Sequence, residues 1–143
     1  MIILDTNVIS EGFRLCPDAR VRMWMDAQPS SDLFLCSPVL AELRYGVERM
    51  PIGARRAQLD RLVLDIEKDL FGNRILPLDR ESAYEFGRVV ARRASIGRPI
   101  NPMDALIAAI AIHHRMVVAT RDIRDFADLG LALINPFEAT AER

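Results

Sequence analysis

The chain has 143 residues, of which 50% are hydrophobic and 27% are charged, and its formal net charge is −1. This length and apolar content suffice for one domain with a buried core. The near-neutral charge argues against nucleic-acid binding driven by bulk positive charge and leaves a local basic surface as an open alternative. The two cysteines, Cys16 and Cys36, form no CxxC pair and have no histidine at zinc-ligand spacing, so we expect reduced thiols in a cytoplasmic protein.

Short apolar runs alternate with amphipathic stretches along the chain, which predicts an α/β fold with a parallel sheet. The runs at 2–4, 33–36, 117–119 and 131–134 are expected as buried strands, and 75–76 as a further short extended segment. We find no linker or internal repeat, so we expect a single domain over residues 1–143.

Helices are expected between these strands, each with a recognisable start or apolar face. They are a short helix through Val8 and Ile9, a helix capped by Asp18, one capped by Ser37 with Pro38 at its first position, one over 54–70, one from Asp79 or Glu81 to about Ser95, and an apolar helix begun by 101–104. The arginines of the fifth helix, Arg88, Arg92 and Arg93, are expected on a solvated face, and a surface that faces phosphate or a partner is the alternative. The longest apolar helical run, 105–112, is far too short to cross a bilayer, and no signal peptide is visible.

Four acidic residues are predicted at one edge of this sheet. Asp5 ends the first strand, with Thr6 and Asn7 as candidate caps of the helix that follows, and Asp122 follows the strand at 117–119. Glu42 lies in the first turns of the helix after the second strand, and Asp104 lies in the first turn of the apolar helix. Strand C-termini and the N-termini of the following helices share one edge of a parallel sheet, so these acids can point into one cleft. They would repel strongly unless a cation lay among them, and a hard ion such as Mg²⁺ or Mn²⁺ prefers carboxylate oxygens.

Each acid also has an ordinary structural explanation. Asp5 can be a turn or cap residue, and Glu42 can be a helix-start acid favoured by the helix dipole. Asp104 lies three residues after Asn101 and can complete a capping box, while Asp122 can cap the next short helix. The metal interpretation depends on the joint position of the four acids.

The two histidines are adjacent, at His113 and His114. On a helix they are expected to face different directions and not to chelate a metal together, so a dipole-compensating or structural role is favoured. The chain has no HExxH, GxGxxG or Walker motif and no nucleophile elbow, which leaves nucleotide-cofactor binding and serine catalysis with little support.

Five segments form a recognisable set: IILDTN at 2–7, AELRYG at 41–46, DALIA at 104–108, TRD at 120–122 with DF at 125–126, and LINPF at 133–137. They resemble motifs of the PIN-domain family, and more narrowly those of VapC- and FitB-type toxins of bacterial toxin–antitoxin pairs. The resemblance spans the whole chain. It implies a PIN-like α/β/α sandwich, with a central parallel sheet and flanking helices, and a metal-dependent ribonuclease inhibited by a small antitoxin that also binds operator DNA.

The resemblance assigns metal-site roles to Asp5, Glu42, Asp104 and Asp122. The family often has asparagine at the position of Asp122 and supplies the acid three residues later, here at Asp125. Either Asp122 or Asp125 therefore completes the site, and Asp122 is favoured because it lies nearer the strand end.

The sequence thus predicts an endoribonuclease that depends on Mg²⁺ or Mn²⁺. Asp5 and Asp104 would be direct ligands, Glu42 and Asp122 further or water-mediated ligands, and Thr6 or Thr120 would position a water or a ligand carboxylate. One alternative is a non-catalytic PIN-like scaffold that binds RNA or a partner. A less favoured one is a phosphatase of the haloacid dehalogenase type, which needs a second aspartate where this chain has Asn7.

The expected partners are a VapB-like antitoxin, an RNA substrate, operator DNA through the antitoxin only, and a second copy of the chain in a homodimer, with no membrane. The helices through 39–47 and 59–66 present apolar stripes between which an antitoxin helix could lie. Five arginines flank these stripes: Arg44, Arg49, Arg55, Arg56 and Arg61. The alternative is that the stripes pack wholly inside the monomer and the arginines are only solvated.

Overall fold

The computed structural model describes residues 1–138, so the last five residues of the predicted domain, 139–143, lie outside the described residues. A five-stranded parallel sheet forms its centre, in the order β3-β2-β1-β4-β5. The strands are β1 (Ile2–Leu4), β2 (Leu33–Cys36), β3 (Ile75–Leu76), β4 (Val117–Ala119) and β5 (Leu133–Ile134). All five were predicted, although β5 begins two residues later than expected. The central strand β1 is buried along its whole length, as a continuous apolar run in a parallel sheet should be.

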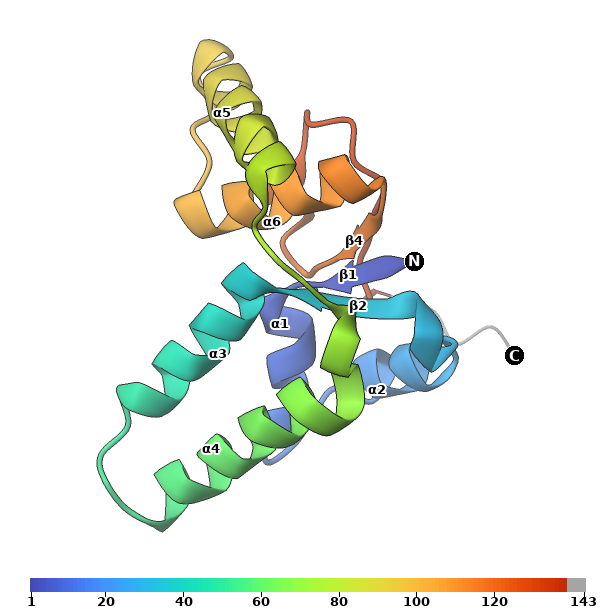
Figure 1. The fold of residues 1–143 in the computed structure, drawn as a ribbon. Helices are drawn as coiled ribbons and strands as arrows, with labels where there is room; N and C mark the ends of the chain where they lie inside the picture. The colour runs from blue at the N-terminus through green and yellow to red at the C-terminus, as the bar shows by residue number, and fades with distance from the viewer. Residues whose placement is uncertain (139–143) are drawn as a thin grey trace.

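Helices lie on both sides of the sheet, with α5 and α6 on one side and α1 to α4 on the other (Figure 1). The α-helices are α1 (Thr6–Ile9), α2 (Ala19–Asp26), α3 (Ser37–Glu48), α4 (Ala54–Asp65), α5 (Arg80–Ser95) and α6 (Pro102–His114). Short helical segments join them, namely η1 (Ser10–Phe13), η2 (Ser30–Asp32), the π-helical η3 (Ile66–Phe71), η4 (Gly72–Arg74) and η5 (Ile123–Phe126). The predicted α/β/α sandwich is therefore confirmed. Within residues 1–138, no helix has the length and apolar character needed to span a membrane.

Helix α6 is the most buried helix, and it carries Asp104 in its first turn and His113 and His114 in its last turn. Asn101 caps it by accepting a hydrogen bond from the Met103 amide at 2.8 Å, and Pro102 occupies its first position. The helix ends at His114, and the residue that follows, Arg115, is its C-cap and has left-handed backbone torsions. With a rise of about 1.5 Å per residue, Asp104 in its first turn and the histidines in its last turn lie roughly 15 Å apart.

Two helix boundaries differ from the prediction. Helix α3 follows β2 directly with Cys36 as its N-cap, and the Ser37 hydroxyl does not cap it. That hydroxyl instead donates to the Leu76 carbonyl at 3.3 Å, which ties α3 to the edge strand β3. The predicted helix over 54–70 is regular only to Asp65 and continues as the π-helical η3.

Arg93 on α5 is buried, with 4% of its surface exposed, so its predicted place on a solvated face was wrong. Its guanidinium donates to three backbone carbonyls, at 2.6 Å to Arg98, 2.7 Å to Asp125 and 3.0 Å to Ala127. Arg88 and Arg92, in contrast, are exposed as expected. Arg93 therefore anchors the loop after β4, which carries Asp125, to helix α5.

Candidate active site

Asp5 lies where β1 ends and α1 begins, and only 5% of its surface is exposed. Its Oδ1 accepts a hydrogen bond from the Thr6 amide at 2.7 Å, so Asp5 itself is the cap of α1, rather than Thr6 or Asn7. Its Oδ2 accepts from the Thr120 hydroxyl at 2.7 Å and from the Asn7 amide nitrogen at 2.9 Å. The capping explanation for Asp5 is thus confirmed, but it uses only one of the two carboxylate oxygens.

Asn7 connects the ends of β1 and β4. Its Nδ2 donates to Asp5 and also to Asp122 Oδ2 at 3.0 Å, while its Oδ1 accepts from the Arg121 amide at 3.1 Å. The Asp122 amide donates to the Thr120 hydroxyl oxygen at 3.0 Å. The Asp122 side chain makes no capping bond to η5, so the capping explanation for Asp122 was wrong. Asn7 instead holds Asp5 and Asp122 on either side of one amide group.

Glu42 lies in the second turn of α3, beyond the first-turn positions at which the helix dipole acts most strongly. Its Oε2 accepts a hydrogen bond from the Thr6 hydroxyl. Thr6 therefore positions Glu42, just as Thr120 positions Asp5. Each threonine thus orients a carboxylate, as predicted, while the metal-ligand role of these carboxylates stays a prediction.

Asp104 faces the other acids and does not form the capping box that its spacing allowed. Asn101 caps α6 alone, and the Asp104 carboxylate makes no hydrogen bond to any other residue in the range 1–138. Burial, as the largest cause, and the negative charges of four other acids together raise the pKa of Asp104 to about 6. In order of effect these acids are Asp5, Asp125, Glu42 and Asp122.

Burial is also the largest cause that raises the pKa of Asp5, and the charges of Glu42 and Asp122 act in the same direction. The hydrogen bonds from Thr120 and Thr6 oppose this shift because they favour the charged form. The structure thus brings all the predicted acids into electrostatic contact at one sheet edge.

The carboxylates nevertheless form an open cluster. Within the described residues, no three of them place one oxygen each within 4.8 Å of one another. Direct binding of one ion by several of them would need side-chain rotation, or water molecules between some carboxylates and the ion. Asp122 is joined to Asp5 through Asn7, whereas Asp125 acts on Asp104 more strongly than Asp122 does, so the choice between Asp122 and Asp125 stays a prediction.

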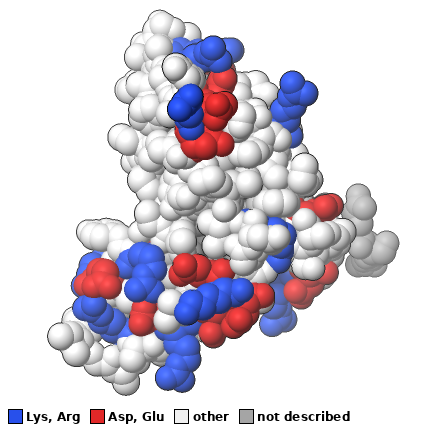
Figure 2. Space-filling view, viewed as in Figure 1, with Lys and Arg blue, Asp and Glu red and all other residues white. Residues whose placement is uncertain are grey.

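A cleft of about 700 Å³ leads away from Thr6, Asn7 and Glu42 between η1, α3 and α4. Arg49 and Arg55 line it, together with Arg14 and Arg121, which the sequence did not indicate as groove residues. Two of the five predicted arginines are engaged elsewhere, since Arg44 pairs with Asp60 at 2.7 Å and Arg56 with Glu48 at 2.5 Å. Figure 2 shows acidic and basic side chains interspersed over the α3–α4 side of the molecule.

A stability prediction follows from the raised pKa of Asp104. In the folded, metal-free protein its pKa is about 6 instead of 3.8, so its ionisation destabilises the fold progressively as the pH rises through this window. Asp104→Asn removes that cost. In EDTA at pH 7.5 we expect the free energy of unfolding of the variant to exceed that of wild type by roughly 1 kcal/mol. This figure allows for solvent screening, because the Asp104 side chain is half-exposed.

The measurement is urea denaturation in EDTA at pH 7.5 and at pH 4. The gain in the variant should shrink towards pH 4, where wild-type Asp104 is protonated in the folded state. A variant that is clearly less stable than wild type at both pH values would instead give Asp104 a structural role.

Comparison with known proteins agrees with this geometry. The family model described as "PIN domain" matches residues 2–131. The chain is 43% identical to the plasmid stability protein StbB of Pseudomonas syringae pv. tomato, over 97% of this chain and 100% of that protein. It is 42% identical to the VapC ribonuclease Y4jK of Sinorhizobium fredii, over 96% and 99% of the two chains.

A solved structure of FitAB bound to an IR36 DNA fragment contains a chain with the same fold. The two chains superpose with a TM-score of 0.92 at 36% sequence identity, and the match covers 100% of both. The match in sequence and in structure extends over nearly the whole length, including the strand ends that carry the acids. This chain therefore belongs to the PIN-domain family, whose nucleases are metal-dependent, and within it to the toxins of the VapC and FitB type.

Proposed function

We propose that this protein is a Mg²⁺-dependent endoribonuclease of the cytoplasm, formed as one domain over residues 1–143, and the toxin of a toxin–antitoxin pair. The observation that carries the proposal is the convergence of Asp5, Glu42, Asp104 and Asp122 from four different elements at one sheet edge. Burial and mutual repulsion raise the pKa of Asp104 to about 6 and also raise the pKa of Asp5. A stable fold gains nothing from such a cluster unless a cation binds to it.

The donor set suits a hard divalent ion, because all candidate ligands are carboxylate oxygens. Asp5 and Asp104 would be the direct ligands, while Glu42 and Asp122 or Asp125 would bind directly or through water. When bound, Mg²⁺ neutralises charge on the scissile phosphate and makes water a better nucleophile. We prefer Mg²⁺ to Mn²⁺ because it is the usual partner of phosphate substrates.

The protein's own side chains supply the positioning. The Thr120 hydroxyl and the Asn7 amide fix Asp5 Oδ2, the oxygen that does not cap α1, and the Thr6 hydroxyl fixes Glu42. A set of ligands held in this way loses little conformational freedom when the substrate binds. The arginines of the cleft, including Arg49 and Arg121, lie where the RNA backbone would leave the site and can donate to its phosphates.

The two alternatives have less support. A haloacid dehalogenase-type phosphatase needs a carboxylate at position 7, and here Asn7 donates its amide to Asp5 and Asp122. A non-catalytic scaffold would not need to retain four acids whose charges repel one another. The test is incubation of the purified, antitoxin-free protein with RNA. Cleavage in Mg²⁺ and none in EDTA supports the nuclease, whereas binding without cleavage in either condition supports the scaffold.

For the partner we propose a VapB-like antitoxin that also binds operator DNA. The FitAB relative is bound to a DNA fragment, and we extend that arrangement to this chain. The cleft between α3 and α4 can hold an antitoxin helix, and it ends at Glu42, where a charged antitoxin side chain would block the acids. A second copy of the chain would join two clefts into a longer RNA groove.

Two measurements test the partner proposals. Light scattering on the isolated chain should give the mass of a dimer. Co-purification with the product of the neighbouring gene should give a complex that no longer cuts RNA. A monomer that neither binds nor is inhibited by that product would contradict the toxin assignment and leave the nuclease assignment standing.

A further inference from the structure

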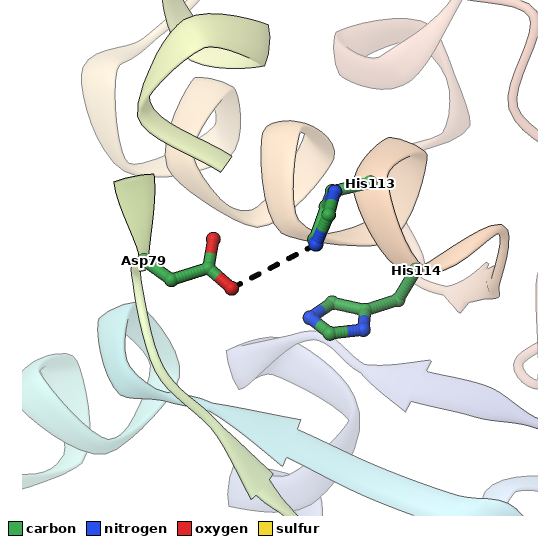
Figure 3. A group of neighbouring side chains, drawn as sticks. All are labelled: Asp79, His113 and His114. Carbon is green, nitrogen blue, oxygen red and sulfur yellow. Dashed lines mark ion pairs between the residues drawn. The ribbon is translucent and has the colours of Figure 1, made fainter. Parts of the chain in front are cut away.

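We propose that Asp79, His113 and His114 form a second metal site, which takes a transition-metal ion such as Zn²⁺. Asp79 precedes α5, and the histidines form the last turn of α6, so the three side chains come from the ends of two packed helices (Figure 3). One ligand atom from each lies within 4.8 Å of the others, and within residues 1–138 no other group of histidine, cysteine or acidic side chains meets this spacing. The expectation that the adjacent histidines face different directions was therefore wrong, because a ligand atom of each lies beside Asp79.

The distance between His113 and Asp79 fits a bridging ion better than a direct bond. His113 Nε2 and Asp79 Oδ2 are 3.7 Å apart, which is too long for a hydrogen bond. In a tetrahedral zinc site with bonds of about 2.1 Å, two ligand atoms lie roughly 3.4 Å apart. Asp79 Oδ1 already accepts from the Ser82 amide at 2.8 Å and caps α5, so the second oxygen is the one left for a ligand.

His114 supplies the third ligand atom. Its Nε2 is buried and has no hydrogen-bond partner in the part of the chain that the structure describes. A buried nitrogen in this state is costly, and a metal ion would use its lone pair. The two imidazole rings meet edge to face with centroids 4.6 Å apart, and Figure 3 shows a nitrogen of each directed towards Asp79. Side-chain rotation thus overcomes the divergence that helical spacing imposes on adjacent residues.

The donor set selects the kind of metal. Two imidazoles and one carboxylate suit Zn²⁺, Co²⁺, Ni²⁺ or Cu²⁺, whereas Mg²⁺ prefers oxygen alone. The side chains of His113 and Asp79 are 32% and 33% exposed, so water can reach the ion and complete its coordination.

This site is distinct from the acidic cluster, because α6 separates its histidines from Asp104 by roughly 15 Å. An ion bound here would link the start of α5 to the end of α6. The expected effect is on stability, because an ion that binds only the folded chain raises its melting temperature.

The experiment is a Zn²⁺ titration by calorimetry, with ZnCl₂ as the only added metal, on wild type and on variants of both sites. Asp79→Asn and His114→Gln should each weaken Zn²⁺ binding by more than about tenfold, since loss of a supporting group alone costs roughly 10- to 100-fold. Asparagine caps helices as well as aspartate does, so Asp79→Asn should leave α5 intact. Glu81→Gln, which removes a neighbouring exposed charge, and Asp104→Asn, in the acidic cluster, should leave this Zn²⁺ affinity unchanged.

Thermal melting gives a second readout. At a Zn²⁺ concentration about 100 times the dissociation constant, the melting temperature of wild type and of Asp104→Asn should rise by on the order of 10 °C, and that of His114→Gln should not. The proposal is overturned if wild type binds no Zn²⁺ at micromolar concentration, if binding is lost only in Asp104→Asn, or if Asp79→Asn and His114→Gln bind as wild type does.

Discussion

Replacement of Asp5 or Asp104 by asparagine should lower the rate of RNA cleavage in Mg²⁺ by about a thousandfold or more, which corresponds to roughly 4 kcal/mol of transition-state stabilisation. A neutral amide binds a hard cation far more weakly than a carboxylate does. The Asp5→Asn variant should still cap α1, because the oxygen of the new amide can accept from the Thr6 backbone N–H. The loss should therefore appear in activity while the circular dichroism spectrum stays that of wild type.

Asp128→Asn is the matched control for these variants. Asp128 is an acid outside the cluster, paired with Arg98 at 2.5 Å, and its positive φ of 67° is one that asparagine tolerates well. The Asp128→Asn variant should therefore cut RNA at the wild-type rate. Wild-type cleavage by both Asp5→Asn and Asp104→Asn would show that the acids have been misassigned. Asp122→Asn and Asp125→Asn in the same assay decide which of the two completes the site, since only the one that does should lose activity strongly.

Arg93→Met should destabilise the protein by about 3 kcal/mol or more and lower its melting temperature by on the order of 10 °C. The substitution keeps the apolar stem but leaves the carbonyls of Arg98, Asp125 and Ala127 without their donor. Unpaired buried acceptors cost about 1 to 3 kcal/mol each, and water entering the gap offsets part of this cost.

Arg92→Met gives the matched control, because Arg92 is the preceding residue on α5 and is exposed. The free energy of unfolding of Arg92→Met should stay within about 0.5 kcal/mol of the wild-type value. The comparison requires urea denaturation of both variants under the same conditions. If the two variants unfold at the same urea concentration, the three carbonyl contacts contribute nothing measurable to stability.

The strands and most helices could be predicted because their signals are local. The fully apolar run of β1, the proline at the start of α3 and the Asn101–Pro102 start of α6 each define an element within a few residues. The acids could be placed at one edge because parallel strands share a direction. These inferences need only the order of elements along the chain.

The predictions that were wrong concerned side chains whose positions depend on contacts between distant parts of the chain. Arg93 reads as one of several helix-surface arginines, and its burial follows from carbonyls up to 34 residues away. The Ser37 hydroxyl finds its acceptor in β3, 39 residues further on. The pairing of His113 and His114 with Asp79 likewise depends on side-chain rotation and on how α5 packs against α6. The spacing of the carboxylates could not be predicted for the same reason.

Binding of Mn²⁺ tests most directly whether the acids at the sheet edge hold the metal. It is measured through the loss of the electron paramagnetic resonance signal of the free ion. We expect wild type and His114→Gln to bind Mn²⁺ equally, because α6 places His114 roughly 15 Å from Asp104 and Mn²⁺ suits carboxylate ligands. Asp5→Asn and Asp104→Asn should bind it at least tenfold more weakly. Equal Mn²⁺ affinity in wild type and in both acid variants would contradict the assignment of the cluster as the metal site.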